Sequence, residues 1–353
     1  MAKPRIPPAT GAAAAAAVAL AGAAAAGGRA VAQRRAEPAP EDPERRYRLR
    51  GDEYVPDGVR RVARGQLAAA HEQLESASAA DLAGAVHETR KALKRVRACV
   101  RLSRDALGEE TYDRENTAFR MAGRRLSGAR GAQVLVETLD ALTERFAAEL
   151  PVEATAALRT RLQEQQAKAT AALREDDTAV ERTLSELGRA RTRTAWWTLE
   201  TDDFTALKPG LRRIYRRGRR GIRAACDDPT TENLHEARKR VKDLWHATQL
   251  VWPAHPKRLE ALSTQAHDVA DLLGDDHDLA VLREVVRAHP QCFEDESSQR
   301  ALLAVLDRRR EALQRDALEL GRKLYAAKPG RFVTDVERGW RKRAGGRSEP
   351  LAG

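Results

Sequence analysis

Aromatic residues are scarce in this sequence, and their scarcity constrains both the fold and the ligands it can bind. Phe, Trp and Tyr make up 4% of the 353 residues, and Ala and Leu dominate the apolar positions. This composition favours helices over sheets, because aromatic and β-branched residues are the ones that prefer strands. The basic segments contain almost no aromatic side chains, whereas single-stranded nucleic acids are usually bound by stacking on such side chains. The composition therefore disfavours that mode of binding.

Motifs for covalent or metal chemistry are also lacking. The three cysteines, Cys99, Cys226 and Cys292, lie far apart and match no metal or disulfide spacing, which fits a reducing compartment. No Gly-rich phosphate loop, GxSxG motif, Ser/His/Asp order or paired-carboxylate signature can be placed. The segment HEARK at His235 begins like the zinc motif HExxH, but Lys239 occupies the position of the second His, where a cation opposes Zn²⁺ binding. The sequence predicts no catalytic residue, no metal ligand and no cofactor.

An Ala-rich run near the N-terminus is short for a membrane span. This run, Ala12–Ala26, has basic residues on both flanks and therefore gives no clear orientation. We expect residues 1–46 to be a disordered or loosely helical tail, with an export signal or weak anchor as the alternative. Residues 346–353 have the composition of a second tail. The expected location is the cytoplasm, and a membrane is not an expected partner.

The chain is strongly basic. Lys and Arg number 63 against 52 Asp and Glu, which gives a formal net charge of +11 and an isoelectric point of about 9.9. Such a balance points to a polyanionic partner: nucleic acid, an acidic membrane or a phosphate polymer. No recognition-helix motif is evident, so sequence-specific nucleic acid is not expected.

One charged segment occurs twice. The segment Leu234–Trp245 reads LHEARKRVKDLW and resembles Val86–Arg97, VHETRKALKRVR, at an offset of 148 residues. This offset is too long for a solenoid and is typical of a duplicated domain half. The matching pairs are His87 and His235, Glu88 and Glu236, Arg90 and Arg238, Lys91 and Lys239, and Lys94 and Lys242.

In each copy the basic residues share one helical face, and the apolar residues share another. At about 100° per residue, the apolar face can be buried while the basic face lines a groove. Like charges spaced i,i+4 repel one another, so their repetition favours a ligand-facing stripe over an ordinary solvated face. The first stripe comprises His87, Arg90, Lys91, Lys94 and Arg101, and the second comprises His235, Arg238, Lys239 and Lys242.

Two further sets of arginines stand at helical spacing. Arg212, Arg216, Arg219 and Arg223 form a single row, opposite an apolar face of small and aliphatic residues. The counterpart upstream, beginning with Arg60 and Arg64, is thinner. Because four arginines in register repel one another, we expect the row to face phosphate. Arg120 and Arg124 are also spaced i,i+4 and are further candidates.

Helical periodicity and breaker residues divide the chain into helices with no alternating strand pattern. The fold class we expect is all-α: two helical bundles facing one another, the first at about 52–195 and the second at about 203–345. Helices are expected from Asp57, from about Ser78 or Asp81, at 112–126, 132–150, 151–174 and 177–193, after Gly210, through the second basic copy, at 258–273, after Leu279, at 297–324 and at 330–342.

The segment Leu273–Leu279, LGDDHDL, leaves two interpretations open. His277 and its neighbouring aspartates could ligate a hard cation. More often such a cluster caps a helix N-terminus and orients nearby Arg and Lys side chains. We favour the second interpretation, and we expect the segment to precede a helix.

Three motifs, the duplicated LHExRKxxK pattern, the YRRGRR helix and LGDDHDLxVL, together resemble the CHAD family, the conserved-histidine α-helical domain, over about residues 50–345. The resemblance implies two four-helix bundles with pseudo-twofold symmetry around a basic pore or cleft that binds inorganic polyphosphate without catalysis. It implicates both basic stripes and the arginine row as pore-lining residues. The sequence departs from the family pattern at Arg130-Gly131, and it has no ExExK motif of the fused triphosphate-tunnel enzymes.

The expected function is therefore a non-catalytic module for binding inorganic polyphosphate. Arginine forks, lysine ammonium groups and histidine N–H groups all suit phosphate oxygens, and a bare phosphate chain needs no stacking surface. The alternatives are a metal-dependent phosphohydrolase that uses His277 with Asp275, Asp276 and Asp278, and a general binder of nucleic acid or other polyanions.

Overall fold

The computed structural model describes residues 47–78, 81–126, 128–150, 152–175 and 177–345, and these residues contain 12 α-helices and three short 3₁₀ helices but no strand. The all-α prediction is confirmed. The described residues belong to one compact unit. The expected tails at 1–46 and 346–353 lie outside the described residues.

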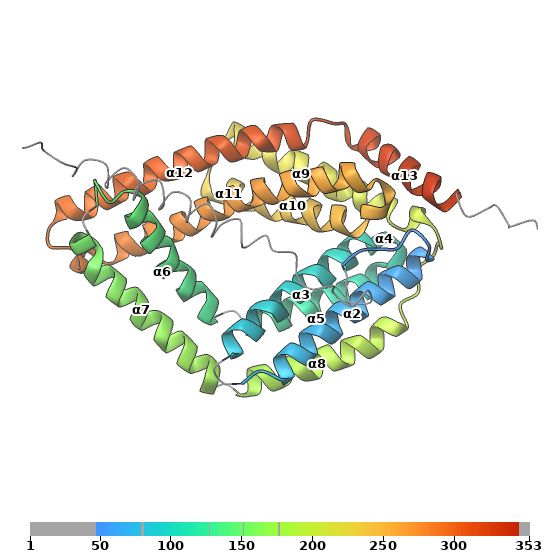
Figure 1. Cartoon of the computed structure of the whole chain (residues 1–353), viewed down its shortest axis with the longest axis horizontal. Coiled ribbons are helices and arrows are strands. Elements are labelled where there is room, and N and C mark those ends of the chain that lie inside the picture. The colour runs from blue at the N-terminus through green and yellow to red at the C-terminus, as the bar shows by residue number, and fades with distance from the viewer. Residues whose placement is uncertain (1–46, 79–80, 127, 151, 176, 346–353) are drawn as a thin grey trace, which may run out of the picture. The chain divides into compact units, whose positions relative to one another are not determined.

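The helices follow one another with short connections (Figure 1). They are α2 (Val55–Glu75), α3 (Leu82–Leu102), α4 (Arg104–Leu107), α5 (Glu109–Arg125), α6 (Gly128–Arg145), α7 (Val152–Glu175), α8 (Asp177–Ala195), α9 (Lys208–Asp227), α10 (Thr231–Leu250), α11 (Pro256–Ala288), α12 (Glu296–Leu324) and α13 (Pro329–Gly345).

The helices that carry the two copies have similar neighbours. Helix α3 packs against α2 and α5, and α2 packs in turn against α8. Helix α10 packs against α9 and α11, and α9 packs in turn against α13. The two groups meet where α3 contacts both α9 and α10, so the two basic copies lie on neighbouring helices.

The apolar faces predicted from the sequence are buried. On α3, Val96 and Val100 are fully buried, and on α10 the same holds for Val241 and Leu244. One hydrophobic cluster includes these side chains and extends from Tyr47 to Trp340, so it is continuous across the junction of α3 with α10. A second cluster joins α6 and α7 to α11 and α12. Burial of the apolar faces fixes the rotation of α3 and α10 about their axes, so that their polar faces point away from the core.

The structure corrects the prediction for the segment Leu273–Leu279. Helix α11 runs without interruption from Pro256 to Ala288, so this segment lies inside a helix and does not cap one. Gly274 does not break the helix because its bare Cα faces α10: a Cβ there would lie 3.1 Å from the Arg238 guanidinium. Gly274 allows α11 to pack closely against Arg238 of α10, and the low helix propensity of glycine gives no sign of this contact.

Candidate functional site

The two basic copies are joined by an ion pair between α3 and α10. The Arg101 guanidinium on α3 lies 2.9 Å from the Asp243 carboxylate on α10, and Arg240 binds the same carboxylate at 3.0 Å. The Asp243 side chain is only 12% exposed. Arg101, a predicted site residue, therefore has a structural partner and holds the two copies together.

Cations from both copies surround one buried imidazole, that of His246 on α10. Burial and the positive charges of Arg101, Arg95, Lys242 and Lys94 lower the pKa of His246 to about 3. Three of these cations come from α3 and one comes from α10. The structure therefore brings the first and second basic stripes together at this point, which we call the α3–α10 junction.

A face of α10 beside the junction packs against α11 and contains buried side-chain nitrogens without hydrogen-bond partners. The His235 and His277 rings lie 4.6 Å apart, centroid to centroid. The Nδ1 atoms of both rings and the Nε of Arg238 are buried, and none has a hydrogen-bond partner among the described residues. Burial, the largest cause, and neighbouring cations lower the pKa of both imidazoles. An anion at this place would accept hydrogen bonds that the protein leaves unmade.

Lys242 lies close to the same cations. Burial and the Arg238 guanidinium lower the pKa of the Lys242 ammonium, while the carboxylates of Asp271 and Asp278 act in the opposite direction. Arg238 thus adds positive charge beside Lys242, and the two aspartates of α11 partly offset it.

Two predicted lysines form ion pairs within their own helices. Lys91 lies 2.9 Å from Glu88 on α3, and Lys239 lies 2.5 Å from Glu236 on α10. Both pairs are about half exposed, so each contributes little to stability and can open for a ligand. His87 is also exposed, and its Nε2 is 3.9 Å from the Glu88 carboxylate.

The remaining predicted residues of the first half differ in their roles. Arg90 donates a hydrogen bond of 3.0 Å to the carbonyl of Leu126, at the C-terminal end of α5, so it binds the end of a neighbouring helix. Arg120 and Arg124 are exposed on α5. The charge of Arg120 contributes to lowering the pKa of Arg97, after burial and Arg101, and Arg120 therefore lies near the junction.

The predicted arginine row lies on a different face of α9 from the junction. All four side chains are exposed and line grooves that α9 forms with α12 and α13. Arg212 and Arg216 line a cavity of about 680 Å³ beside α13, and Arg219 and Arg223 line one of about 340 Å³ beside α12. Among the described residues, only Arg223 of this row has an ion pair, with Asp227 at 3.8 Å.

Two other arginines of α9, Arg213 and Arg217, lie near the residues of the junction and were not among the predicted site residues, and Arg213 also lines the cavity beside α13. Arg213 pairs with Asp105 at 2.6 Å and donates a hydrogen bond of 3.0 Å to the carbonyl of Arg101. Burial and the charge of Arg240 lower the pKa of Arg217, which places it against α10. Each follows a member of the row by one position, so it points about 100° away from that row. The sequence contained one sign of these two residues: Arg213 and Arg217 are themselves spaced i,i+4 and so form a second short row of arginines on α9.

Arg95 and Arg97 on α3 were also missed. The charge of Arg95 acts on the buried His246, and burial together with the charge of Arg101 lowers the pKa of Arg97 to about 10. Both lie at the edges of the basic stripe, between the stripe and the buried face, and neither has a counterpart among the matching pairs of the two copies.

The aspartate cluster on α11 orients a neighbouring arginine. Asp276 is 1% exposed, and its carboxylate accepts hydrogen bonds from Arg310 at 3.0 Å and Gln314 at 2.7 Å. In the described part of the chain, no group of three or more His, Cys, Asp or Glu side chains is arranged to hold a metal ion. We expected the aspartates of this segment to orient neighbouring Arg and Lys side chains, and the contact of Asp276 with Arg310 is of this kind.

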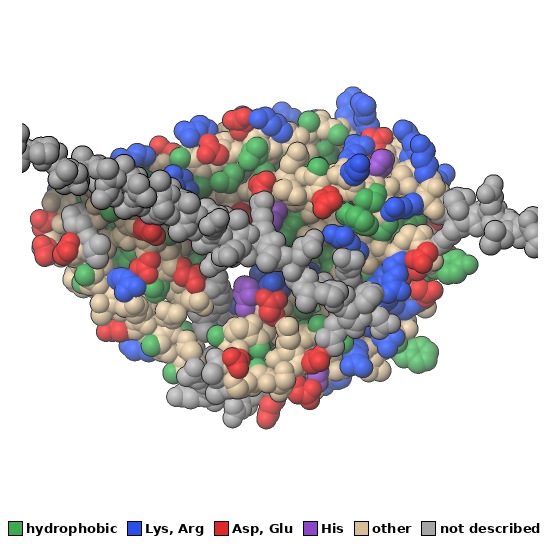
Figure 2. Space-filling view, in the orientation of Figure 1, with side chains coloured by type: hydrophobic (Ala, Val, Ile, Leu, Met, Phe, Trp, Pro, Cys, Tyr) green, Lys and Arg blue, Asp and Glu red, His purple; other side chains and the backbone are tan. Residues whose placement is uncertain are grey.

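Positive and negative side chains are interspersed over the face of the molecule shown in Figure 2. The positive charge is thus not gathered in one continuous patch on this face. None of the helices in the described ranges is long and apolar enough to cross a membrane.

The fold and the site first define a class of protein: it is all-α, and two similar basic helices pack side by side with their cations around one buried histidine. Residues 61–287, more than half of the chain, match the CHAD domain, and the chain belongs to the CHAD-domain family. No curated protein matches the chain.

Proposed function

We propose that this protein binds inorganic polyphosphate at the α3–α10 junction and that binding requires no catalysis. The observation that carries the proposal is the convergence of Lys94, Arg95 and Arg101 from α3 with Lys242 from α10 around His246. Cations of two separate helices approach one another there at an electrostatic cost. A chain of phosphates would offset that cost along its whole length. In this proposal the two halves form paired bundles, and the junction is the wall of the basic pore or cleft between them.

The ligand is a bare phosphate chain rather than a nucleic acid, because the aromatic side chain at the junction is already occupied. Trp245 stacks on His246 with ring centroids 4.7 Å apart, and on His267 at 4.6 Å. It is therefore not free to stack on a base, which is the usual contribution of aromatics to single-strand binding. The unpartnered Nε–H of Arg238, and the Nδ1 atoms of His235 and His277 when they carry a proton, suit phosphate oxygens.

In this proposal Asp276 on α11 has a structural role and takes no part in hydrolysis. Arg310 and Gln314 already engage the Asp276 carboxylate, so that it holds α12 against α11. The three free cysteines agree with the cytoplasmic location that we propose. We propose no cofactor and no membrane partner.

The test is the affinity for labelled long-chain polyphosphate of Lys94→Glu and Lys242→Gln, with Lys168→Glu as the matched control. Lys168 is exposed on α7 and belongs to neither basic copy. We expect each junction variant to lose on the order of tenfold in affinity, since a charge-assisted hydrogen bond contributes about 1.5–3 kcal/mol. Lys168→Glu should bind like the unchanged protein.

Two controls make the result decisive. Circular dichroism must show that Lys94→Glu keeps its helical content, and excess single-stranded and duplex DNA must be added as competitors. Equal affinities of Lys94→Glu and Lys168→Glu would refute the junction as the site. Complete displacement of polyphosphate by DNA would replace a polyphosphate site with a general polyanion surface.

A further inference from the structure

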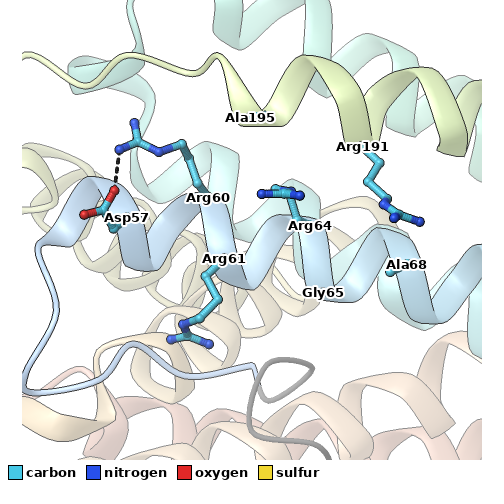
Figure 3. Close-up of a pocket in the computed structure, with 8 residues that line it drawn as sticks. All are labelled: Asp57, Arg60, Arg61, Arg64, Gly65, Ala68, Arg191 and Ala195. Atoms are coloured by element: carbon cyan, nitrogen blue, oxygen red, sulfur yellow. Dashed lines mark hydrogen bonds and ion pairs between the residues drawn. The ribbon is translucent and has the colours of Figure 1, made fainter.

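A separate basic groove lies between α2 and α8, away from the residues of the junction (Figure 3). Its volume is about 360 Å³, and its lining includes Arg60, Arg64 and Arg191. Gly65 and Ala68, two small residues, also line it. Because these residues are short, they leave the arginine side chains reachable from solvent.

One arginine of the groove is fixed by the protein. Arg60 donates hydrogen bonds of 2.6 Å to the carbonyl of Trp197 and of 2.6 Å to the Asp57 carboxylate. Figure 3 shows the second of these contacts and shows the Arg60 guanidinium directed toward the end of α8. The Asp57 carboxylate therefore largely neutralises the charge of Arg60.

The other two arginines have no such partners. Arg64 on α2 and Arg191 on α8 are exposed, and among the described residues neither makes a hydrogen bond or an ion pair. Both lie in the space between the two helices in Figure 3. Two unpaired guanidinium groups at one groove repel each other, and an anion between them would be held by charge-assisted hydrogen bonds from both.

The groove has a counterpart on the second half of the chain. Helix α2 packs against α3 and α8, just as α9 packs against α10 and α13. Arg60 and Arg64 precede Arg212 and Arg216 by 152 residues, close to the offset of the two basic copies. Arg212 and Arg216 line the cavity between α9 and α13. Equivalent arginines thus line equivalent grooves on the outer helices.

We propose that the α2/α8 groove is a second phosphate-binding site, in which Arg64 and Arg191 bind oxygens of an inorganic phosphate chain. This inference rests on the proposed function and extends it to a surface outside the junction. No aromatic side chain lines the groove, so it provides charge without a stacking surface. The chain would then be bound at several places at once, and the overall affinity would exceed that of the junction alone.

The experiment is calorimetric titration with a short oligophosphate of defined length, too short to reach two sites at once. The variants are Arg64→Gln/Arg191→Gln and, as the matched control, Arg182→Gln. Arg182 is an exposed arginine of α8 that stands nine residues before Arg191, half a turn away around the helix, and it does not line the groove. We expect the double variant to lose one equivalent of bound oligophosphate and the control to lose none.

A second measurement requires no substitution. Modification of arginines with phenylglyoxal, followed by peptide mass spectrometry, should show oligophosphate protecting Arg64 and Arg191 at least severalfold more than Arg182. If the double variant binds as many equivalents of oligophosphate as the unchanged protein, and oligophosphate does not protect Arg64 and Arg191, the groove is not a phosphate site. The proposal for the junction would still stand. Absence of binding by the unchanged protein would instead overturn the proposed function.

The same titration identifies the competing ligand class. Trp196, which follows the groove residue Ala195, is 80% exposed and could stack on a base. Tighter binding of a single-stranded oligonucleotide than of oligophosphate, lost in Trp196→Ala, would assign the groove to nucleic acid and overturn the phosphate-chain assignment.

Discussion

At the scale of single residues, the clearest expectation concerns His246 and the pH dependence of stability. Burial and four neighbouring cations lower the pKa of His246 to about 3, against an ordinary value near 6.5 in the unfolded chain. A group whose folded pKa is depressed in this way prefers its neutral form, so its contribution to stability is full above pH 6.5. That contribution is lost as the pH falls toward 3, at about 1.4 kcal/mol for each pKa unit.

We therefore expect the thermal unfolding temperature to fall between pH 7 and pH 5, and His246→Phe to reduce that fall. Phenylalanine preserves the ring contacts with Tyr47 and Trp245 and removes the proton-binding nitrogen. The measurement is calorimetric unfolding across this pH range. His71→Phe, at a partly exposed histidine of α2 outside the junction, is the control substitution. The same slope in both variants would contradict this account.

The sequence did not predict which partner each basic side chain of the site contacts. Helical spacing placed His87, Arg90 and Arg101 on one stripe, yet Arg90 binds a carbonyl of α5 and Arg101 binds Asp243 on α10. Which cation finds a partner depends on residues far away in the sequence. Hydrophobic periodicity gives the rotation of one helix but not its neighbours.

At the scale of helices, the repeated segment allowed much more to be predicted. The buried faces of α3, α9 and α10 follow the apolar pattern, because burial of such a face dominates the stability of a helix. The prediction was wrong at Leu273–Leu279, where a glycine and three aspartates indicate a break. Tertiary contacts of Gly274 and Asp276 compensate for the poor local propensity.

Close packing of α9 on α3 gives a prediction at this scale. A Cβ at Gly210, near the start of α9, would lie 1.8 Å from the carbonyl oxygen of Leu102 at the end of α3. Because that atom belongs to the backbone, Gly210→Ala must push the helices apart, and we expect a loss of about 1–3 kcal/mol in the free energy of unfolding. Urea denaturation measures it.

The matched control is Gly188→Ala on α8, where a Cβ would meet nothing within 4 Å. Removing a glycine from an open position in a helix should stabilise the protein by about 0.5–1 kcal/mol. The two alanine substitutions are thus expected to have opposite signs. A Gly210→Ala protein as stable as Gly188→Ala would mean that α9 is not held tightly against α3.

At the scale of the whole molecule, the two partly buried histidines between α10 and α11 should link polyphosphate binding to pH. His235 and His277 face each other between α10 and α11, and the groups around them are Lys239, Arg238 and Arg310 with the carboxylates of Glu236, Asp276 and Asp278. In the free protein burial lowers both imidazole pKa values, with neighbouring cations acting in the same direction.

A bound phosphate chain brings negative charge to these rings and so raises their pKa values. Binding then takes up protons, and affinity must rise as the pH falls from neutral toward the free-state pKa values and level off below them. We expect His235→Gln/His277→Gln to flatten this dependence, measured with long chains at constant ionic strength so that the terminal phosphates and screening do not vary. Because the backbone phosphates of long chains stay ionised throughout, a slope that is just as steep in the double variant would have to come from elsewhere on the protein. The pair would then be a packing feature of α10 and α11, and the hydrogen bonds that we assign to its unpartnered nitrogens would not form.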